Sequence, residues 1–498
     1  MVFHLLGFWR THSDYQQFVV NKLSAIAKRS PGSLLEYQTE ISKLYILDLD
    51  PLKSVISQLY SPIGRPAEYQ PEIFRACILM QQLGIAPDNW ADKLKNNLVL
   101  RTICGFDDHL PGIASYYDFI NRIVRFKEPP RRKKKKRKPS KKLGKGKKLP
   151  PKHPGIVQKL VDKIIDGRRF NQRPELVLQK IFAEVCVKKS IDLGLIPQTV
   201  SISGDGTCIP TGASHFGVKT CECAKSGNYR CDCPRRFSDP NATWGWDSHK
   251  ELWFYGYTGY FISTHNKAEK LDLPLYLRLV EASRHDSISA VVALAEFRDL
   301  YPNLTVDTFI SDSASDNYAT YKLLDHWGIS AVIALNSTNK GNFQYPEHLS
   351  LNEYGVPICS GGNEMVYWGF CRKDRCRLKW RCPKAAGKTC DSCVNCSPSP
   401  YGRVIYTKPD WDLRLFTTIP RGSERWKLKM NERTAAERVN NRILNHYGVE
   451  ASKTRGKGRI SFLTAIAGFN VHLDAWLAKL SATGNFDFFS LFDISLSA

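Results

Sequence analysis

The order of strand-like and helix-like segments between residues 199 and 336 constrains the fold more than any other feature of this chain. Three segments rich in β-branched, aromatic and aliphatic residues come first, and helical and strand patterns then alternate. The predicted strands are 199–207, 252–264 and 273–283, followed by helix 286–301, strand 304–312, helix 317–328 and strand 329–336. This order predicts an α/β fold, with a mixed sheet covered by helices.

The first 128 residues have only helical patterns, broken by Pro and Gly. In segment 71–84, apolar residues keep helical spacing, Pro71 suits a first helical turn, and Gly84 suits a stop. A second helix is expected from about Asp88 to residue 100. Two helices joined by a short break are typical of helix-turn-helix DNA readers and also of ordinary packing or dimerisation, so 1–128 is a candidate domain for binding DNA ends.

Segment 129–155 is a predicted polybasic linker, because it has prolines near both ends, glycines within and almost no apolar residues to bury. Of the 72 Lys and Arg residues, 14 lie between Arg131 and Lys152. A solvated spacer and a localisation signal are the alternatives to an arm that lies on DNA phosphates. The candidate DNA contacts here are Arg131, Arg132, Lys133, Lys134, Lys135, Lys136, Arg137 and Lys138.

The net charge of +24 predicts a polyanionic partner, because Lys and Arg that neutralise phosphates release condensed counterions. Double-stranded DNA is the leading candidate. A membrane surface is the rival partner, but the basic run lacks the interleaved aromatics of an interfacial helix. With no uninterrupted apolar run of about 18 residues and no signal-like N-terminus, the chain is expected to be cytoplasmic and nucleoid-associated.

Two aspartates lie where strand-like segments are predicted to end. Asp205 lies where the first strand pattern gives way to glycines, and Asp312 closes a later strand before a Ser-rich turn. In an open α/β sheet, an acid at the carboxyl end of a strand projects into the crevice where ligands bind. One such aspartate alone is more often a turn residue, whereas two on neighbouring strands predict a site.

Glu437 is the third carboxylate, in segment 431–443, which has the pattern of an amphipathic helix. Arg433, Glu437 and Asn440 share a face beside its apolar stripe. Taken alone, Arg433 and Glu437 predict only a surface ion pair worth a few tenths of a kcal/mol. Together with Asp205 and Asp312, Glu437 becomes a predicted metal ligand.

Three carboxylates are the residue types that phosphoryl chemistry with Mg²⁺ or Mn²⁺ requires. Two divalent cations about 3.5–4 Å apart can activate an attacking oxygen and stabilise a leaving oxygen at phosphorus. Mg²⁺ prefers oxygen ligands and binds through a few carboxylates plus substrate phosphates. The sequence therefore predicts a site for two such ions at Asp205, Asp312 and Glu437.

These residues resemble the DDE transposases of bacterial insertion sequences, whose catalytic domain has the RNase H-like fold. Segments 64–84 and 98–123 look like the helical N-terminal domain of such enzymes, and "GDGT", "FISDSASD" and "RTAAER" carry the three acids. In many members the Glu lies in a signature of Tyr, two residues, Arg, three residues, Glu, six residues, Lys. Arg433 and Glu437 keep that spacing, whereas Met430 and Leu444 replace the Tyr and the Lys.

The resemblance implies metal-dependent hydrolysis at the ends of a mobile element, followed by attack of the freed 3′-hydroxyl on target DNA by a homo-oligomer. Asp205 and Asp312 would share the metals, Glu437 would hold one, and Arg433 and Arg438 would contact phosphate. The catalytic domain would be 156–498, with insertions at about 209–250 and 338–425. The alternatives are an RNase H-like endonuclease without strand transfer and a retired transposase that only binds DNA.

The 15 cysteines include two clusters that are candidate structural zinc sites. Four thiolates close in space suit tetrahedral Zn²⁺, although neither cluster has a standard zinc-finger spacing and reduced loop thiols are the alternative. The first candidate set is Cys221, Cys223, Cys231 and Cys233. The second is Cys382, Cys390, Cys393 and Cys396, from a longer run that begins at Cys371 and Cys376.

Two further segments have an ordinary structural interpretation. His285 and Asp286 suit the start of a helix as a cap better than acid/base chemistry. The aromatic residues of 244–257 are expected to be strand core, with stacking on an unpaired base as the alternative.

Overall fold

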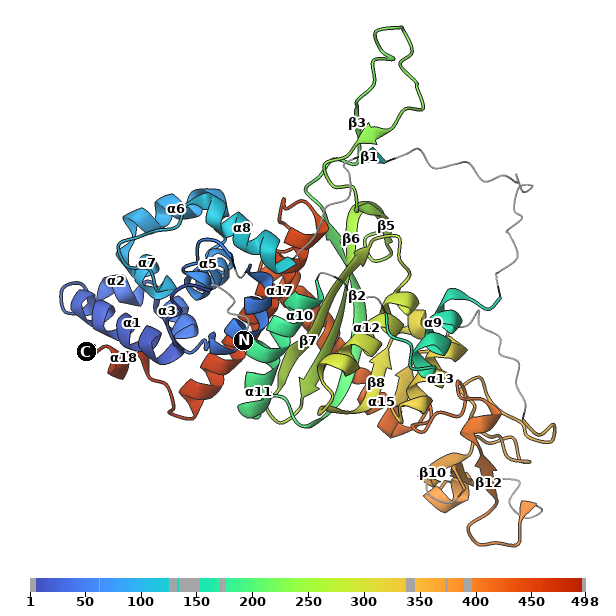
Figure 1. Cartoon of the computed structure of the whole chain (residues 1–498). Coiled ribbons are helices and arrows are strands. Elements are labelled where there is room, and N and C mark those ends of the chain that lie inside the picture. The colour runs from blue at the N-terminus through green and yellow to red at the C-terminus, as the bar shows by residue number, and fades with distance from the viewer. Residues whose placement is uncertain are drawn as a thin grey trace.

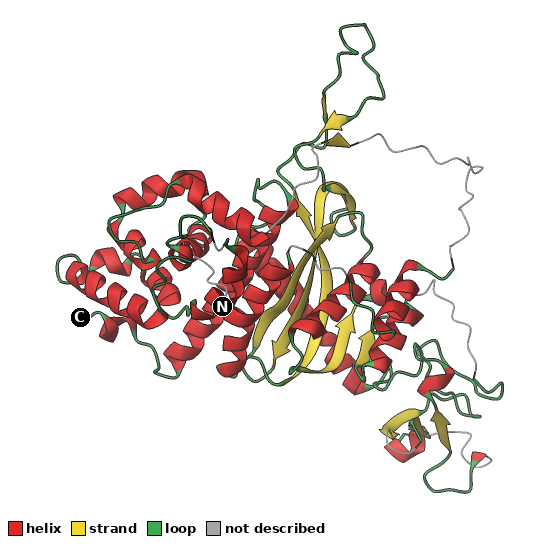
Figure 2. Cartoon of the chain, in the orientation of Figure 1, coloured by secondary structure: helices red, strands yellow, loops and turns green. Residues whose placement is uncertain are grey.

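A computed structural model of the chain describes residues 6–61, 63–124, 153–170, 173, 175–336, 345–371, 375–388 and 396–494, and the backbone of Arg132–Lys133. Its centre is a six-stranded sheet in the order β5-β6-β2-β8-β9, with β7 also paired to β6 (Figures 1 and 2). The strands are β2 (Thr199–Pro210), β5 (Thr243–Asp247), β6 (Leu252–Asn266), β7 (Leu271–Glu281), β8 (Thr305–Ser311) and β9 (Ser330–Ile333).

The sheet is mixed, as predicted. β6 pairs antiparallel with β2, β5 and β7, whereas β8 runs parallel to β2 and β9 runs parallel to β8. Helices α12 (Asp286–Leu300) and α13 (Tyr318–His326) connect the parallel strands. The hydrophobic pattern therefore predicted this part of the fold correctly, because strands and helices differ in the spacing of their apolar residues.

Helices lie on both sides of the sheet (Figure 1). On one side α12 packs on β2, β6 and β7 and is backed by α9 (Ile156–Ile165). On the other, the same strands contact α16 (Thr434–Asn441), and β7 contacts α17 (Lys457–Ala482). Before β2, the chain forms α10 (Leu176–Phe182), a π-helical stretch η2 (Ala183–Val187) and α11 (Lys188–Asp192).

The N-terminal region is helical and shares one hydrophobic core with the sheet domain. In α5, Pro71 lies in the first turn and Gly84 has a positive φ of 64° just past the end, as the sequence indicated. The ring of Phe74 packs edge-on against Phe469 of α17. The helices are α1 (His12–Ala27), α2 (Gly32–Leu35), α3 (Gln38–Tyr45), α4 (Asp50–Ile56), α5 (Gln70–Gln82), α6 (Pro87–Asn96), α7 (Leu98–Cys104) and α8 (Ile113–Val124), with a 3₁₀ turn η1 (Ser57–Leu59) after α4.

Helix α17 is the one described helix that is long and apolar enough to cross a membrane, but 83% of its most apolar window is buried inside the protein. Phe462, Phe469 and Trp476 are among its buried side chains. Its apolar composition is accounted for by its place in the core. A short helix, α18 (Phe488–Leu491), follows it.

Two segments project from this body (Figure 1). The first is a hairpin after β2, which carries β3 (Val218–Lys219) and β4 (Arg235–Arg236). The second is a small antiparallel sheet of β10 (Val366–Cys371), β11 (Arg377–Arg381) and β12 (Val404–Thr407), with 3₁₀ turns η4 (Pro383–Ala386) and η5 (Pro409–Trp411) and an apolar cluster that includes Trp380 and Phe416.

Two predicted boundaries require correction. The first strand does not end at Asp205 but continues to Pro210, and β5, within the predicted insertion 209–250, belongs to the central sheet. Segment 431–443 is not one helix either, because α15 (Glu424–Asn431) ends before α16 begins and a π-helical turn, η6 (Arg442–His446), follows α16.

Candidate functional site

Asp205 lies in the middle of β2, paired across the strands with Phe261 of β6. Its side chain points to the α16 side of the sheet, where Asn440 Nδ2 donates to Asp205 Oδ2 at 2.9 Å. Burial, with the nearby negative charge of Asp312 second, raises the pKa of Asp205 from 3.8 to about 6. Glu437 adds to this rise, and Arg433 opposes it. Asp205 is therefore an acid held in a site that already contains negative charge.

Asp312 follows the last residue of β8 and caps the 3₁₀ turn η3 (Ser313–Ser315), where its side chain accepts from the Ala314 N–H at 3.1 Å. β8 pairs with β2 only as far as Ser203. Asp312 consequently lies beside the next stretch of β2, which contains Asp205. The prediction that these two aspartates lie on adjacent strands of the sheet is confirmed.

Glu437 lies in the first turn of α16, and its side chain is 49% exposed. Its Oε1 accepts from Arg433 Nη2 at 2.6 Å, which is the surface ion pair that the i,i+4 spacing alone predicts. The helix is fixed on the sheet by its buried residues Ala435, Ala436 and Val439. The negative charge of Glu437 thus contributes to the raised pKa of Asp205, while the Glu437 carboxylate is paired with Arg433.

The charges of Asp312 and Glu437 both act on Asp205, but the three carboxylates do not form a closed cluster of ligand atoms. Among the residues that the structure describes, the set of three or more His, Cys, Asp or Glu ligand atoms that lie within 4.8 Å of one another consists of four cysteines. The roles assigned to Asp205, Asp312 and Glu437 therefore stay predictions.

The donor set around Asp205 nevertheless fits a hard divalent cation. All three side chains offer carboxylate oxygens, which Mg²⁺ and Mn²⁺ prefer. Asn440 is only 7% exposed, and while its Nδ2 bonds Asp205, its Oδ1 is buried without a hydrogen-bond partner. An unpaired buried oxygen is costly, and a cation ligated beside Asp205 would satisfy it.

A fourth acid, Asp286, lies near this site on the opposite face of β2. A Cβ built on Gly206 would come within 2.6 Å of Asp286 Oδ1, so this carboxylate lies directly over Gly206. Burial, with Asp312 second, raises the pKa of Asp286. Its neighbour His285 caps α12 as predicted, since His285 Nδ1 accepts from the Ser287 N–H at 3.2 Å. The local sequence indicated only the cap, and no local signal placed Asp286 near Asp312.

A cavity of about 690 Å³ opens beside Asp286 and Gly206. Three tryptophans line it, and they are 45% (Trp244), 49% (Trp246) and 65% (Trp253) exposed. Trp246 and Trp253 pair across β5 and β6 with ring centroids 5.3 Å apart. The expectation that these aromatics are strand core is therefore wrong for the three tryptophans, although it holds for Tyr257, which is fully buried. The strands extend past the core here and present their aromatic rings to the cavity.

The candidate phosphate-binding residues differ in the contacts that they make in the structure. Arg438 forms a two-bonded ion pair with Asp272 of β7, from Nε to Oδ2 at 2.5 Å and from Nη2 to Oδ1 at 3.0 Å. Within the polybasic segment, the backbone of Arg132–Lys133 forms β1, which pairs antiparallel with β4. Arg131, Lys134, Lys135, Lys136, Arg137 and Lys138 lie outside the described residues.

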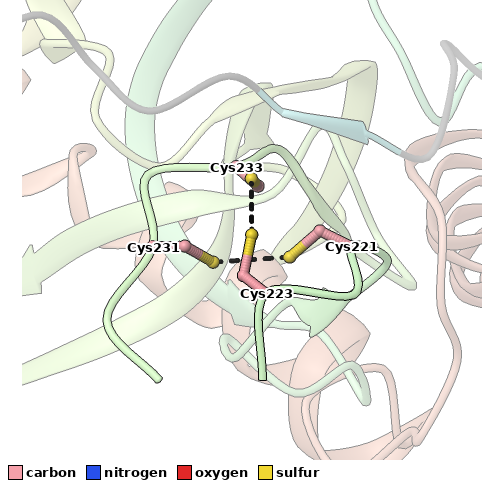
Figure 3. A group of neighbouring side chains, drawn as sticks. All are labelled: Cys221, Cys223, Cys231 and Cys233. Atoms are coloured by element: carbon pink, nitrogen blue, oxygen red, sulfur yellow. Dashed lines mark hydrogen bonds between the residues drawn. The ribbon is translucent and has the colours of Figure 1, made fainter. Parts of the chain in front are cut away.

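The two cysteine clusters also differ. Cys221, Cys223, Cys231 and Cys233 converge at the projecting hairpin, with Sγ–Sγ distances of 3.4 Å between Cys221 and Cys231 and 3.6 Å between Cys223 and Cys233 (Figure 3). In the second cluster, Cys382 is buried and Cys396 Sγ lies 3.2 Å from Ser360 Oγ. Cys390 and Cys393 lie outside the described residues, so the second zinc site stays a prediction.

No protein family matches the sequence, and no curated protein matches it. Among solved structures, the chain is similar to a cryo-EM structure of a piggyBac transposase synaptic complex with hairpin DNA, at 10% sequence identity and a TM-score of 0.37. The match covers 91% of this chain and 78% of that chain. A similarity at this level transfers no functional residue.

Proposed function

We propose that the protein is a DNA transposase of the DDE type, which cleaves DNA at element ends and transfers the 3′-hydroxyl to target DNA. One observation carries the proposal: Asp312, beside β2, and Glu437, on helix α16 packed over β2, both add negative charge around the buried carboxylate of Asp205. These acids are far apart in sequence, and a purely structural sheet has no need to bring them together at such a cost. The RNase H-like assignment of the mixed sheet is part of the same proposal.

In this proposal, Asp205, Asp312 and Glu437 hold two Mg²⁺ or Mn²⁺ ions, and Asn440 fixes the orientation of the Asp205 carboxylate through its 2.9 Å hydrogen bond. When bound, such ions activate the attacking oxygen and stabilise the leaving oxygen in an in-line displacement at phosphorus. Arg433 lies one turn before Glu437 and would bind a phosphate after it exchanges its ion pair. Glu437 would then be available as a ligand.

The charge and the cavity support DNA as the substrate. An excess of 24 positive charges over negative ones attracts a polyanion. The tryptophan-lined cavity offers faces on which an unpaired base stacks, and Lys250 and Arg284 lie among its lining residues. We place the enzyme with DNA in the cytoplasm, acting as a homo-oligomer on the element ends.

Cleavage of supercoiled plasmid and of oligonucleotides that contain candidate ends tests the proposal. The full chain is expected to cut DNA with Mg²⁺ or Mn²⁺ and not with EDTA, and Glu437→Gln is expected to lose at least a hundredfold in rate. Glu432→Gln is the matched control. Glu432 is a nearby glutamate between α15 and α16, but its carboxylate pairs with Lys429 at 3.1 Å. Equal cleavage by the two variants would refute the role of Glu437.

Joining of labelled ends to a target plasmid separates a transposase from an endonuclease of the same fold. Joined products are expected from the transposase, whereas nicks without joining would favour the endonuclease. Retained DNA binding with no cleavage under any divalent cation would indicate a retired transposase.

A further inference from the structure

The projecting hairpin between Ala213 and Asp239 has no hydrophobic core of its own. Every residue from Ser214 to Ser238 is at least partly exposed, including Phe216 at 69% and Tyr229 at 70%. A segment that buries so little apolar surface cannot offset the conformational entropy of ordering its backbone. Another interaction must therefore hold the hairpin in one conformation.

The base of the hairpin is fixed to the body of the protein. Asp239 is buried and accepts from Tyr257 Oη at 2.6 Å and from the Gly456 N–H at 3.0 Å. Gly212 packs so closely on the backbone of Lys453 that a Cβ would lie 2.1 Å from its carbonyl oxygen. These contacts order the two ends of the hairpin and leave its outer part unexplained.

The outer part contains the four cysteines, two from each arm. Each C-x-C pair contributes two thiols, and the two pairs face each other (Figure 3). All four Sγ atoms lie within 4.8 Å of one another. Zn–S bonds of about 2.3 Å in a tetrahedron place the sulfurs about 3.8 Å apart. The observed separations of 3.4 and 3.6 Å are close to that edge length and far from the about 2.05 Å of a disulfide bond.

We propose that Cys221, Cys223, Cys231 and Cys233 bind one structural zinc ion that orders the hairpin. Four thiolates from two C-x-C pairs give a closed tetrahedral site, which suits a structural ion rather than a catalytic one. The cation replaces the missing hydrophobic core, because metal binding to such small segments is coupled to their folding. This inference does not depend on the proposed function, since it concerns only the fold of the hairpin.

The zinc site also lies next to the strand on which part of the polybasic segment docks. Strand β4 is the central strand of a small sheet with β3 and β1, and it starts two residues after Cys233. Arg132 pairs with Arg236 and Lys133 with Arg235 in antiparallel register. The zinc site therefore holds the strand edge on which the backbone of Arg132–Lys133 docks. Loss of the metal is expected to release that docking as well as the hairpin.

The first experiment measures bound metal on the purified full-length chain. Elemental analysis is expected to give one equivalent of zinc less for Cys223→Ser/Cys233→Ser than for the wild type, and no loss for Cys208→Ala, a half-buried thiol outside both clusters. X-ray absorption is expected to detect four sulfur ligands at this site, as the difference between wild type and the double variant. Equal zinc content in all three proteins, or two disulfides in the intact mass of the native protein, would overturn the inference.

The second experiment measures order in the hairpin without reference to activity. Trypsin sites in the hairpin, such as Lys225 and Arg230, are expected to be cut at least tenfold faster after chelation or in Cys223→Ser/Cys233→Ser, with cleavage in the N-terminal helices unchanged. Amide exchange of Arg132–Lys133 and Arg235–Arg236 is expected to speed up in the same samples. Unchanged proteolysis and exchange after metal removal would show that zinc does not order this segment.

Discussion

Replacing Asp205 with asparagine is expected to stabilise the metal-free protein while it abolishes nuclease activity. The physical reason is that Asp205 is largely buried beside other carboxylates, so its ionised form is less favourable in the folded state than in the unfolded state. Asparagine has nearly the same shape and can still accept the hydrogen bond from Asn440. The substitution removes the charge and keeps the local packing.

The pKa gives the magnitude. A rise in the pKa of Asp205 from 3.8 to about 6 corresponds to about 3 kcal/mol of unfavourable free energy for the ionised group at neutral pH. This is an upper figure, because the side chain keeps some contact with solvent. With about 2 cal/mol/K of unfolding entropy per residue, a chain of 498 residues that unfolds as one unit gains about 3 °C in Tm at most.

The pH dependence has a definite sign. Because the folded pKa of this acid is raised, the penalty is fully present above about pH 6 and is relieved as the pH falls toward the unfolded value near 3.8. As the pH is lowered from 7 to 4, protonation of Asp205 is therefore expected to raise the free energy of unfolding of the wild type, measured by denaturant titration in EDTA. Asp205→Asn is expected to lack that gain, so the difference between the two proteins shrinks at low pH.

Mg²⁺ provides the complementary measurement. A cation that binds only the folded state stabilises it by mass action, so Mg²⁺ is expected to raise the Tm of the wild type more than that of Asp205→Asn. Asp307→Asn is a matched control on the neighbouring strand, where Asp307 accepts from Ser201 Oγ at 2.8 Å. If Asp205→Asn were less stable than the wild type at pH 7.5 and equally responsive to Mg²⁺, the electrostatic argument for the site would be refuted.

Three other perturbations test separate parts of the structure. Trp253→Ala is expected to weaken binding of single-stranded or end-frayed DNA by about 1–3 kcal/mol in fluorescence anisotropy, and Trp253→Phe is expected to restore most of it; equal binding by both variants would exclude stacking. Arg414→Met removes the guanidinium that forms an ion pair with Asp316, whose side chain is fully buried, and is expected to cost about 3–5 kcal/mol in denaturant titration, with exposed Arg403→Met as the control. DNA affinity is expected to fall with salt at a log-log slope of about 0.9 per neutralised phosphate, and a flat response would exclude phosphate contacts.

The sequence predicted the elements of the sheet domain because their signals are local. Strand and helix periodicities located β2, β6, β7, β8 and β9 and the helices between them. The cap at His285 and the start and stop of α5 were predicted for the same reason. In each of these cases a few neighbouring residues determine the structure, so one sequence suffices.

The error at Asp205 has a physical explanation. The glycines on either side of it suggested the end of a strand, but β2 continues, and the glycines are required by distant residues. A Cβ on Gly204 would lie 2.4 Å from Tyr260 Oη, and one on Gly206 would lie 2.6 Å from Asp286 Oδ1. Both neighbours come from other elements, so nothing near Asp205 in the sequence distinguishes close packing from a turn.

The tryptophans were misplaced because β-propensity does not distinguish a strand inside the core from a strand that extends beyond it. Trp246 and Trp253 are a cross-strand pair near the tip of β5 and β6, where no helix covers them enough to bury the rings. Their neighbour in sequence, Tyr257, enters the core and is fully buried. Exposure here depends on where the covering helices end, which is a property of the whole fold.

The three acids differ in how firmly the fold holds them, and this difference locates the adjustable part of the site. Asp205 is fixed on a central strand by Asn440, and Asp312 is fixed by its capping bond. Glu437 alone is half exposed, and its ion pair with Arg433 is worth only about 0.3–0.5 kcal/mol. So weak a bond is readily exchanged for stronger contacts with a cation or a phosphate. The position of α16, set by Ala435, Ala436 and Val439 against the sheet, therefore determines whether Glu437 reaches Asp205.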